Sequence, residues 1–469
     1  MIKFVDKIEK IKESNLVFLI EKKEDLEKIK KFNIDDKIIK DINRKIDDNI
    51  TFAENYSLLD EKFAKIYVFY FSSKEKGDIN YFIWEEFRKL PWNLTVIPNK
   101  TDNIELLINN LLLWRYKFEK YKTTKKEEDK IYFVLDSKCD KERAEERLKT
   151  IENIILARDL WETPSNDLFP EEFAHIVEKT EFKNTKLNIF YEKELKKLWL
   201  NLILWVWKWS KNKPCMIILE KITNKKYPTF WFVWKGITFD SWWIQVKPWD
   251  FMYEMKWDMN WAGTLFALMK ELDNKDLKVN IVACIVLAEN SIWENCFKPS
   301  DIIKSYSWKT IDILHTDAEW RLVIADWISY ISQNYKLDKI ITLATLTWAC
   351  MRALWFRYAW IMWDDENFIK LFEDYWKYNV EKYWRMPFED YYVEKTKWKY
   401  ADLENIHDKI SIWATMGAAF LYNFVLNGEK FTHIDMWWTA INSYEPFWYV
   451  TTWMTWFWVD SIGKIIRNV

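Results

Sequence analysis

The chain has 469 residues, of which 49% are hydrophobic and 30% are charged, and its formal net charge is −2 at pH 7. This length is enough for two or three domains with a large buried core, and the balanced charge gives no support to binding of nucleic acid or an anionic membrane. Five cysteines lie scattered without a CxxC pair, and no uncharged apolar run reaches the roughly 18 residues of a membrane helix. The first residues also lack the apolar core of a signal peptide, so we expect a cytoplasmic protein with reduced thiols.

The N-terminal part of the chain alternates apolar runs with charged, helix-like stretches, which predicts an α/β domain. Strands are expected at 66–73, 93–98 and 130–137, and a helix is expected at 103–121. The segment 140–160 has helical spacing, and Pro164 and Asn166 mark a turn behind it. We therefore predict an N-terminal domain at 1–138 and a linking helix at 139–164.

The remaining residues, 165–469, again show an α/β pattern, and their apolar strands suit a central mixed sheet with helices on both faces. Strands are expected at 186–191, 215–220, 229–235, 279–289, 309–314, 339–345 and 431–436, and helices at 261–274 and 320–335. The predicted fold class is therefore α/β, with a smaller N-terminal α/β domain and a larger C-terminal α/β domain.

Glycine and tryptophan occur in abnormal amounts. The chain has 6 glycines and 33 tryptophans, whereas glycine averages about 7% of residues. Several tryptophans stand in turn-like settings, such as Trp249 behind Pro248 and Trp261 behind Asn260, where the backbone freedom of glycine is normally needed. We predict that many of these positions are glycine in the working protein, as expected where a UGA codon specifies glycine and has been read as tryptophan. A genuinely tryptophan-rich protein is the alternative.

Three segments combine charged residues with apolar, turn-rich surroundings: 232–243, 255–263 and 315–322. Each places a carboxylate at the expected end of a strand or start of a helix, and ligand crevices of open α/β sheets lie at the carboxyl ends of strands. Several acidic groups converging there would repel one another unless divalent cations neutralised them. Such cations could lower the pKa of a water molecule and polarise a carbonyl group.

With tryptophan read as glycine, these segments become VGKGITFDSGG, MKGDMNGAG and HTDAEGRL. The third resembles the signature NTDAEGRL of the leucyl aminopeptidase family (M17, cytosol aminopeptidase). The other two resemble that family's lysine–aspartate and DMGGAA-type segments. The resemblance continues in order through 345–349 and 435–440, while the N-terminal domain matches only loosely.

The resemblance implies a site for two divalent metal ions per subunit. Asp240 and Glu319 would bridge the two ions, and Asp317 would complete one site. Lys235 and Asp258 would complete the other, which requires a neutral lysine whose pKa is depressed by burial and by the nearby ions. Zn²⁺, Mn²⁺ and Mg²⁺ all suit this oxygen-rich set of ligands.

Catalytic roles for Lys247 and Arg321 are also implied by the resemblance. Lys247 would stay charged and help to hold the oxyanion of the reaction. Arg321 would hold a bicarbonate-like anion that serves as general base, because a guanidinium suits a planar oxyanion. The α-amine of the substrate would bind one metal ion, which explains the removal of single N-terminal residues.

Substrate contacts follow from the same resemblance. Thr345 and Leu346 would offer backbone groups to the peptide, while Met255 and Trp348, the latter as glycine, would line the pocket for the first side chain. The implied activity is that of a metallo-exopeptidase, a hydrolase that releases leucine-type residues from peptide N-termini. The implied assembly is a cytoplasmic homohexamer.

Two alternatives stay open. An inactive scaffold follows if the tryptophans are natural, because indoles at Trp242, Trp243 and Trp320 would fill space that the ligands need. DNA binding, as in some members of the family, gets no support from the net charge. His315 replaces the usual asparagine of the signature, and we expect a structural role for it. The histidines show no HExxH spacing, which disfavours a single-zinc protease.

Overall fold

The protein is described here by a computed structural model that covers most of the chain. Outside the described residues lie 1, 6, 8–10, 12–13, 21–22, 31, 33, 59–62, 73–78, 92, 99–103, 125–129, 136, 209, 242–251, 254, 292–297, 345–353, 355–357, 364, 377–380, 408–412, 436–440, 443–452 and 455–457. The chain divides into two compact units, Met1–Glu152 with Tyr444–Thr452, and Asn153–Ser443 with Trp453–Val469. Each unit has its own α/β sheet, so the predicted fold class is confirmed.

Unit 1 is built on a six-stranded sheet in the order β1-β6-β5-β2-β4-β3, in which only β3 runs antiparallel to its neighbour. The strands are β1 Ile2–Val5, β2 Ser14–Ile20, β3 Phe52–Ser57, β4 Phe63–Tyr70, β5 Leu94–Ile97 and β6 Ile131–Val134. The main helices are α1 Leu26–Lys30, α2 Asp36–Asp47, α3 Ile79–Phe87 and α4 Ile104–Arg115. Helix α5 (Lys138–Glu162) follows and belongs partly to each unit.

Unit 2 is built on an eight-stranded mixed sheet in the order β15-β14-β17-β13-β9-β10-β8-β7. The strands are β7 Lys186–Tyr191, β8 Cys215–Lys221, β9 Thr229–Asp240, β10 Asn280–Asn290, β13 Lys339–Ala344, β14 Tyr358–Trp363, β15 Lys382–Arg385 and β17 Lys430–Asp435. Strand β9 lies parallel to both β10 and β13, so its carboxyl end opens among parallel neighbours at the centre of the sheet. This is the place where parallel sheets offer a ligand crevice.

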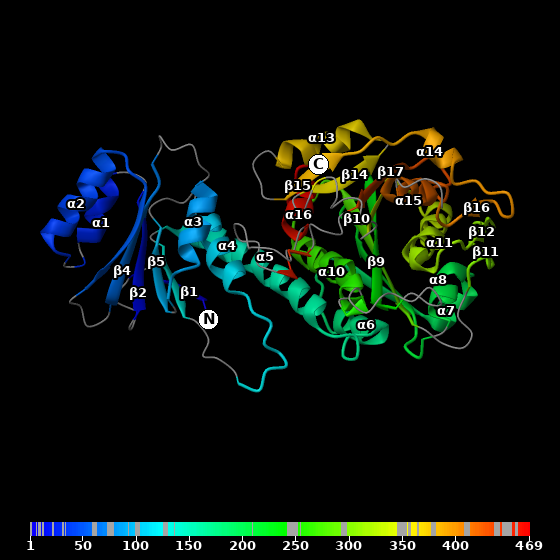
Figure 1. Ribbon diagram of the computed structural model, residues 1–469, viewed down its shortest axis with the longest axis horizontal. Helices are drawn as coiled ribbons and strands as arrows, with labels where there is room; N and C mark the ends of the chain where they lie inside the picture. Colours follow the sequence, from blue (N-terminus) through cyan, green and yellow to red (C-terminus); the bar gives the residue numbers. More distant parts are fainter. Residues whose placement is uncertain are drawn as a thin grey trace. The chain divides into compact units, whose positions relative to one another are not determined.

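Helices cover both faces of this sheet (Figure 1). One face packs against α6 Pro170–Glu178, α10 Asn260–Leu272, α13 Glu366–Trp376 and α16 Val459–Arg467. The other packs against α8 Asn201–Trp207, α11 Glu319–Asn334 and α15 Trp413–Tyr422. Phe230, Phe232 and Trp234 of β9 enter the first cluster, while Trp231 and Val233 enter the second. The strand therefore alternates between two buried faces, as a central strand must.

A smaller sheet of three short strands, β11 Ile302–Lys304, β12 Thr310–Asp312 and β16 Leu403–Glu404, also belongs to unit 2. Its strands β12 and β16 pair in parallel, which brings the residues after 404 next to the loop that leads into α11. Within the described part of the chain, no helix is long and apolar enough to cross a membrane.

Candidate metal centre

The carboxyl-terminal half of β9 carries two of the predicted ligands, Lys235 and Asp240. Five residues apart, they would point to opposite faces of a regular strand. The pairing with β10 shifts here, since Ile237 pairs with Ala288 and Asp240 with Asn290, which leaves one extra residue in β9. Such a bulge reverses the alternation. Asp240 therefore returns to the face of Lys235, the side on which α11 packs.

Lys235 is the charged centre of the first half of the site. Its Nζ lies 2.5 Å from Oδ2 of Asp258 and 3.2 Å from Oε1 of Glu319. Asp258 lies in a single 3₁₀ turn, η4 Met255–Met259, directly before α10, and Glu319 is the first residue of α11. All three side chains are almost fully buried. Two segments far from β9 in sequence thus bring a carboxylate each to the same ammonium group.

The pKa of Lys235 reflects these neighbours. Burial opposes the charged form, but Asp258, Glu319 and Asp240 together outweigh burial and hold the pKa above its usual value. The predicted depression of this pKa therefore depends on the charge of bound cations, which would have to displace a proton from the lysine.

Three carboxylates form the second half of the site. One oxygen each from Asp240, Asp317 and Glu319 lies within 4.8 Å of the others. Like charges at this separation repel strongly in a buried place, and a hard divalent cation is the partner that oxygen clusters of this size suit. The donor set therefore fits a metal ion, and Glu319 takes part in both halves.

The loop that carries Asp317 is fixed by its own side chains and by Asn405. Nδ1 of His315 accepts a hydrogen bond from the backbone N–H of Asp317 (3.1 Å), so this histidine caps the 3₁₀ turn η5 Thr316–Ala318. Oδ1 of Asn405 accepts from the N–H groups of Leu314 (2.8 Å) and His315 (3.2 Å), and its Nδ2 donates to the carbonyl of His315 (2.6 Å). These contacts agree with the structural role expected for His315.

Asn290 holds Asp240 in a similar way. Its Nδ2 donates to Oδ1 of Asp240 (2.6 Å), and its backbone carbonyl accepts from both the N–H and the Oγ–H of Ser241 (3.0 Å each). Neither Asn290 nor Asn405 was predicted from the sequence. A lone asparagine at the end of a strand has no spacing that distinguishes it, and only the pairing of β9 with β10 reveals what it contacts.

Arg321 lies two residues beyond Glu319 and one beyond Trp320, and its guanidinium is almost fully buried. One nitrogen, Nη1, donates to the backbone carbonyl of Asn405 (2.6 Å). Burial lowers the pKa of Arg321 to about 10, although Glu319 and Asp435 oppose this change. The guanidinium is held beside the carboxylates, where an anion could approach it.

The remaining predicted residues divide into two groups. Met255 is buried at the start of η4, three residues before Asp258. Lys247, Thr345, Leu346 and Trp348 lie outside the described residues. The structure therefore brings together five of the predicted residues: Lys235, Asp240, Asp258, Asp317 and Glu319. Along the chain, Met255 lies close to Asp258, and Arg321 lies close to Glu319.

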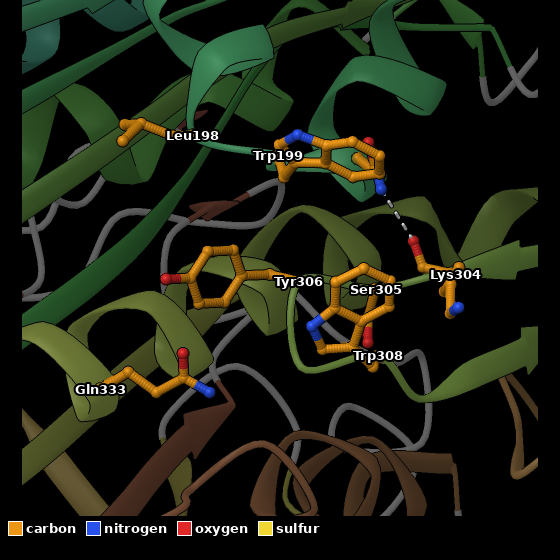
Figure 2. A pocket seen from close by; sticks show the side chains of 8 residues that line it. Leu198, Trp199, Lys304, Ser305, Tyr306, Trp308 and Gln333 are labelled. Carbon is orange, nitrogen blue, oxygen red and sulfur yellow. Dashed lines mark hydrogen bonds between the residues drawn. The ribbon is translucent and has the colours of Figure 1, made fainter.

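A pocket of the described chain lies away from these carboxylates, on the surface near α7 Glu192–Lys197 and β11 (Figure 2). Two of its walls are Trp199 and Trp308, whose rings stack at 6.0 Å and are 60% and 64% exposed. It holds no acidic side chain among its lining residues. The chemistry of the carboxylate cluster is therefore separate from this pocket.

Residues 155–462 match the catalytic domain of the cytosol aminopeptidase family, Peptidase_M17, which is more than half of the chain. The chain belongs to the cytosol aminopeptidase family. The predicted resemblance is therefore confirmed, and with it the class of enzyme, a metallo-exopeptidase. The family match begins within α5 and includes every predicted site residue.

Curated relatives agree with this assignment. A chain named "Probable cytosol aminopeptidase" from Brucella anthropi is 35% identical over 370 residues, covering 76% of this chain and 73% of the relative. One of the same name from Treponema denticola is 34% identical over 372 residues, covering 74% and 77%.

Solved structures share the fold. The cytosol aminopeptidase from Coxiella burnetii aligns with a TM-score of 0.81 at 22% identity, covering 100% of this chain and 99% of that one. The bottromycin maturation enzyme BotP in complex with Mn aligns with a TM-score of 0.78 at 21% identity, covering 89% and 93%. Together with the carboxylate cluster, the family assignment supports a divalent metal cofactor.

Proposed function

We propose that this chain is a dinuclear-metal aminopeptidase that hydrolyses the first peptide bond of peptides, with leucine-type N-terminal residues preferred. The observation that carries the proposal is the convergence of one lysine and four carboxylates at the carboxyl end of β9. A single cation would leave part of this set unused, whereas two cations that share Glu319 and Asp240 use all five groups.

The five ligands supply the site, and each has a position that supports its role. Asp240 and Glu319 would bridge the ions, Asp317 would complete one coordination sphere, and Lys235 with Asp258 would complete the other. When bound, two divalent ions supply Lewis acidity, which polarises a scissile carbonyl and makes water more acidic. Zn²⁺, Mn²⁺ and Mg²⁺ remain alternatives, because all three suit this set of ligands.

Arg321 and Lys247 are proposed to act on the reacting groups rather than on the metals. The buried guanidinium of Arg321 would hold a bicarbonate-like anion close to the carboxylates, where the anion can accept a proton from the attacking water. Lys247, from the segment 242–251, would stabilise the negative charge that develops on the scissile carbonyl oxygen. Met255, Thr345, Leu346 and Trp348, the last as glycine, are proposed to contact the substrate.

The assembly and location also belong to the proposal. A cytoplasmic homohexamer acting on peptides is what the family assignment suggests for this chain. DNA binding receives no support from the net charge of −2, and a salt-dependent DNA-binding assay would reveal it.

The test uses the chain with glycine at its UGA-encoded tryptophan positions, assayed on leucine p-nitroanilide with added Mn²⁺ or Zn²⁺. We expect metal-dependent release of p-nitroaniline, which Asp317→Ala abolishes. Glu178→Gln, a change at an exposed carboxylate of α6, serves as control and should leave the rate unchanged. The proposal is wrong if an active preparation keeps its activity after Asp317→Ala or after chelation of the metal.

A further inference from the structure

The backbone identifies particular tryptophans as glycine positions. Trp199 has φ 58° and follows the end of α7, where its N–H bonds the carbonyl of Lys196 (3.2 Å) and the N–H of Leu200 bonds that of Leu195 (3.3 Å). These two bonds make a Schellman motif, in which the left-handed residue is usually glycine. An indole there is strained, because a Cβ in the left-handed region crowds the following carbonyl.

Trp308 has the same left-handed backbone conformation, in the hairpin between β11 and β12. Its φ is 69°, its N–H bonds the carbonyl of Ser305 (3.0 Å), and Ser305 in turn bonds Lys309 (2.9 Å). A turn followed by a left-handed residue is a common hairpin connection that takes glycine at this position. Two of the residues that line the pocket in Figure 2 are therefore indoles on glycine-type backbone, so we assign no ligand to that pocket.

Buried indoles give a second, independent sign. Within the described part of the chain, several indole N–H groups are shielded from solvent without an acceptor; they belong to Trp161, Trp207, Trp231, Trp234, Trp261 and Trp360. A buried donor without an acceptor destabilises the folded state, and native proteins contain few of them. Replacement by glycine removes each of these donors.

Trp320, which stands where the family signature has glycine, lies close to the candidate site. Trp320 is buried in the first turn of α11, and the guanidinium carbon of Arg321 lies 5.0 Å from the centre of its ring. The imidazole of His433, on β17, stacks on the same indole, with ring centroids 6.1 Å apart and an interplanar angle of 21°. One indole therefore contacts two buried nitrogen-bearing groups.

Both groups have a nitrogen without a partner in the described chain, Nε of Arg321 and Nε2 of His433. Nδ1 of His433 lies 2.8 Å from Oγ1 of Thr342, whose other acceptor, the carbonyl of Thr432, is at 3.5 Å. The shorter contact favours donation from the threonine hydroxyl to Nδ1, which leaves the proton of the neutral imidazole on Nε2. Burial, and then Arg321, lower the pKa of His433 to about 3, so the ring is neutral at neutral pH.

We propose that, with glycine at position 320 as in the family signature, His433 is a second ligand of the small oxyanion that Arg321 is proposed to hold, in the cavity left by the indole. In this cavity His433 donates from Nε2 to the same small oxyanion that Arg321 holds. The N-terminal turn of α11 adds to the attraction, since no side chain caps it and its first N–H groups face this end of the helix. His433 is thus a positioning residue for the anion, and this role rests on the proposed function of Arg321.

The test uses sodium bicarbonate as the probe and compares chains with glycine or tryptophan at position 320. Each chain is assayed in CO₂-depleted buffer for the bicarbonate concentration that gives half-maximal activity, and for the rise in melting temperature that bicarbonate causes. We expect both responses in the glycine chain and neither in the tryptophan chain, because the indole fills the cavity.

In the glycine chain, His433→Phe keeps a ring but removes the donor. It should raise the half-maximal bicarbonate concentration about tenfold or more, as loss of a hydrogen bond to a charged group implies. The maximal rate at saturating bicarbonate should change little. His433→Gln, which can place a donor near Nε2, should recover most of the affinity, and His175→Phe at an exposed histidine of α6 should change nothing.

The proposal is overturned if His433→Phe lowers the melting temperature but leaves the bicarbonate dependence unchanged, since that result indicates packing alone. It is also overturned if the tryptophan chain responds to bicarbonate as strongly as the glycine chain. A melting response that depends on His433 without any peptidase activity would uphold the anion cavity and contradict the proposed function instead.

Discussion

Helix α11 carries two buried acids whose surroundings differ completely. Glu319 and Asp326 are each 1% exposed. Asp326 accepts two backbone hydrogen bonds, from the N–H of Leu202 (2.7 Å) and of Tyr306 (2.6 Å), and so connects α8 and a neighbouring turn to α11. Glu319 instead lies beside Lys235 and within a cluster of three carboxylates. Burial alone therefore does not identify a functional acid; the charge of its neighbours does.

The largest effect on activity should appear when each of these two acids is exchanged for its amide, and it should appear only at Glu319. Glu319→Gln removes the carboxylate shared by both halves of the site. Its loss should lower kcat/KM by more than the roughly 10–100-fold that loss of an outer-shell partner costs. Asp326→Asn should leave kcat/KM within a few-fold, since its contacts are to backbone N–H groups. Steady-state kinetics at saturating Mn²⁺ measures kcat/KM of both variants. Equal losses of kcat/KM would contradict the different roles of the two acids.

A smaller effect is expected at Asn290, which holds Asp240 without being a ligand itself. Asn290→Ala should weaken metal binding about 10–100-fold, as is typical when a ligand loses its supporting hydrogen bond. The maximal rate at high metal concentration should be largely recovered. Metal titration by calorimetry measures this, with Asn188→Ala on the edge strand β7 as a control. An unchanged metal affinity would show that the contact to Asp240 has no role in orienting it.

The pH dependence of the free energy of unfolding should reveal the raised pKa of Asp326. Burial raises the pKa of this acid to about 7, although its two backbone hydrogen bonds oppose the change. An acid whose pKa is higher in the folded protein contributes stability below its unfolded pKa of about 4, and loses it as the pH rises through 7. Urea unfolding between pH 4 and 8 should therefore show a decline that Asp326→Asn reduces. The same slope in both proteins would contradict the assignment.

The smallest effect is a change in stability at Trp199, in the turn between α7 and α8. Trp199→Gly should raise the free energy of unfolding by about 1–2 kcal/mol, because a left-handed residue with a side chain is strained by that amount. Trp384→Gly is the matched control, because Trp384 is also exposed but lies in the extended backbone of β15. We expect it to lose about 0.5–1 kcal/mol, the cost of glycine in a strand. A destabilising Trp199→Gly would refute the glycine assignment of that turn.

The sequence predicted the two α/β sheets because apolar runs bounded by polar turns fix strand positions well; β7, for instance, matches the expected range 186–191. It underestimated β9, which continues to Asp240 rather than ending near 235, because Gly236 and Thr238 interrupt the apolar run. Gly236 fits there since a Cβ would lie 2.6 Å from a side-chain atom of Leu287. Tight approach between strands is invisible in a single sequence.

The five residues that converge at the end of β9 were named from the sequence, because their order along the chain resembles that of a family. Their geometry could not. The bulge that turns Asp240 toward Lys235 depends on pairing with Asn290, and the support of the Asp317 loop depends on Asn405, more than 80 residues away in sequence. Contacts of this kind arise only once distant strands have taken their register.

Asn405 connects two parts of the candidate site. Its side chain hydrogen-bonds the loop that leads to Asp317, while its main-chain carbonyl accepts a hydrogen bond from the guanidinium of Arg321. The spacing between Asp317, a proposed metal ligand, and Arg321, the proposed anion-binding residue, thus depends on one residue, so a change at position 405 should disturb both.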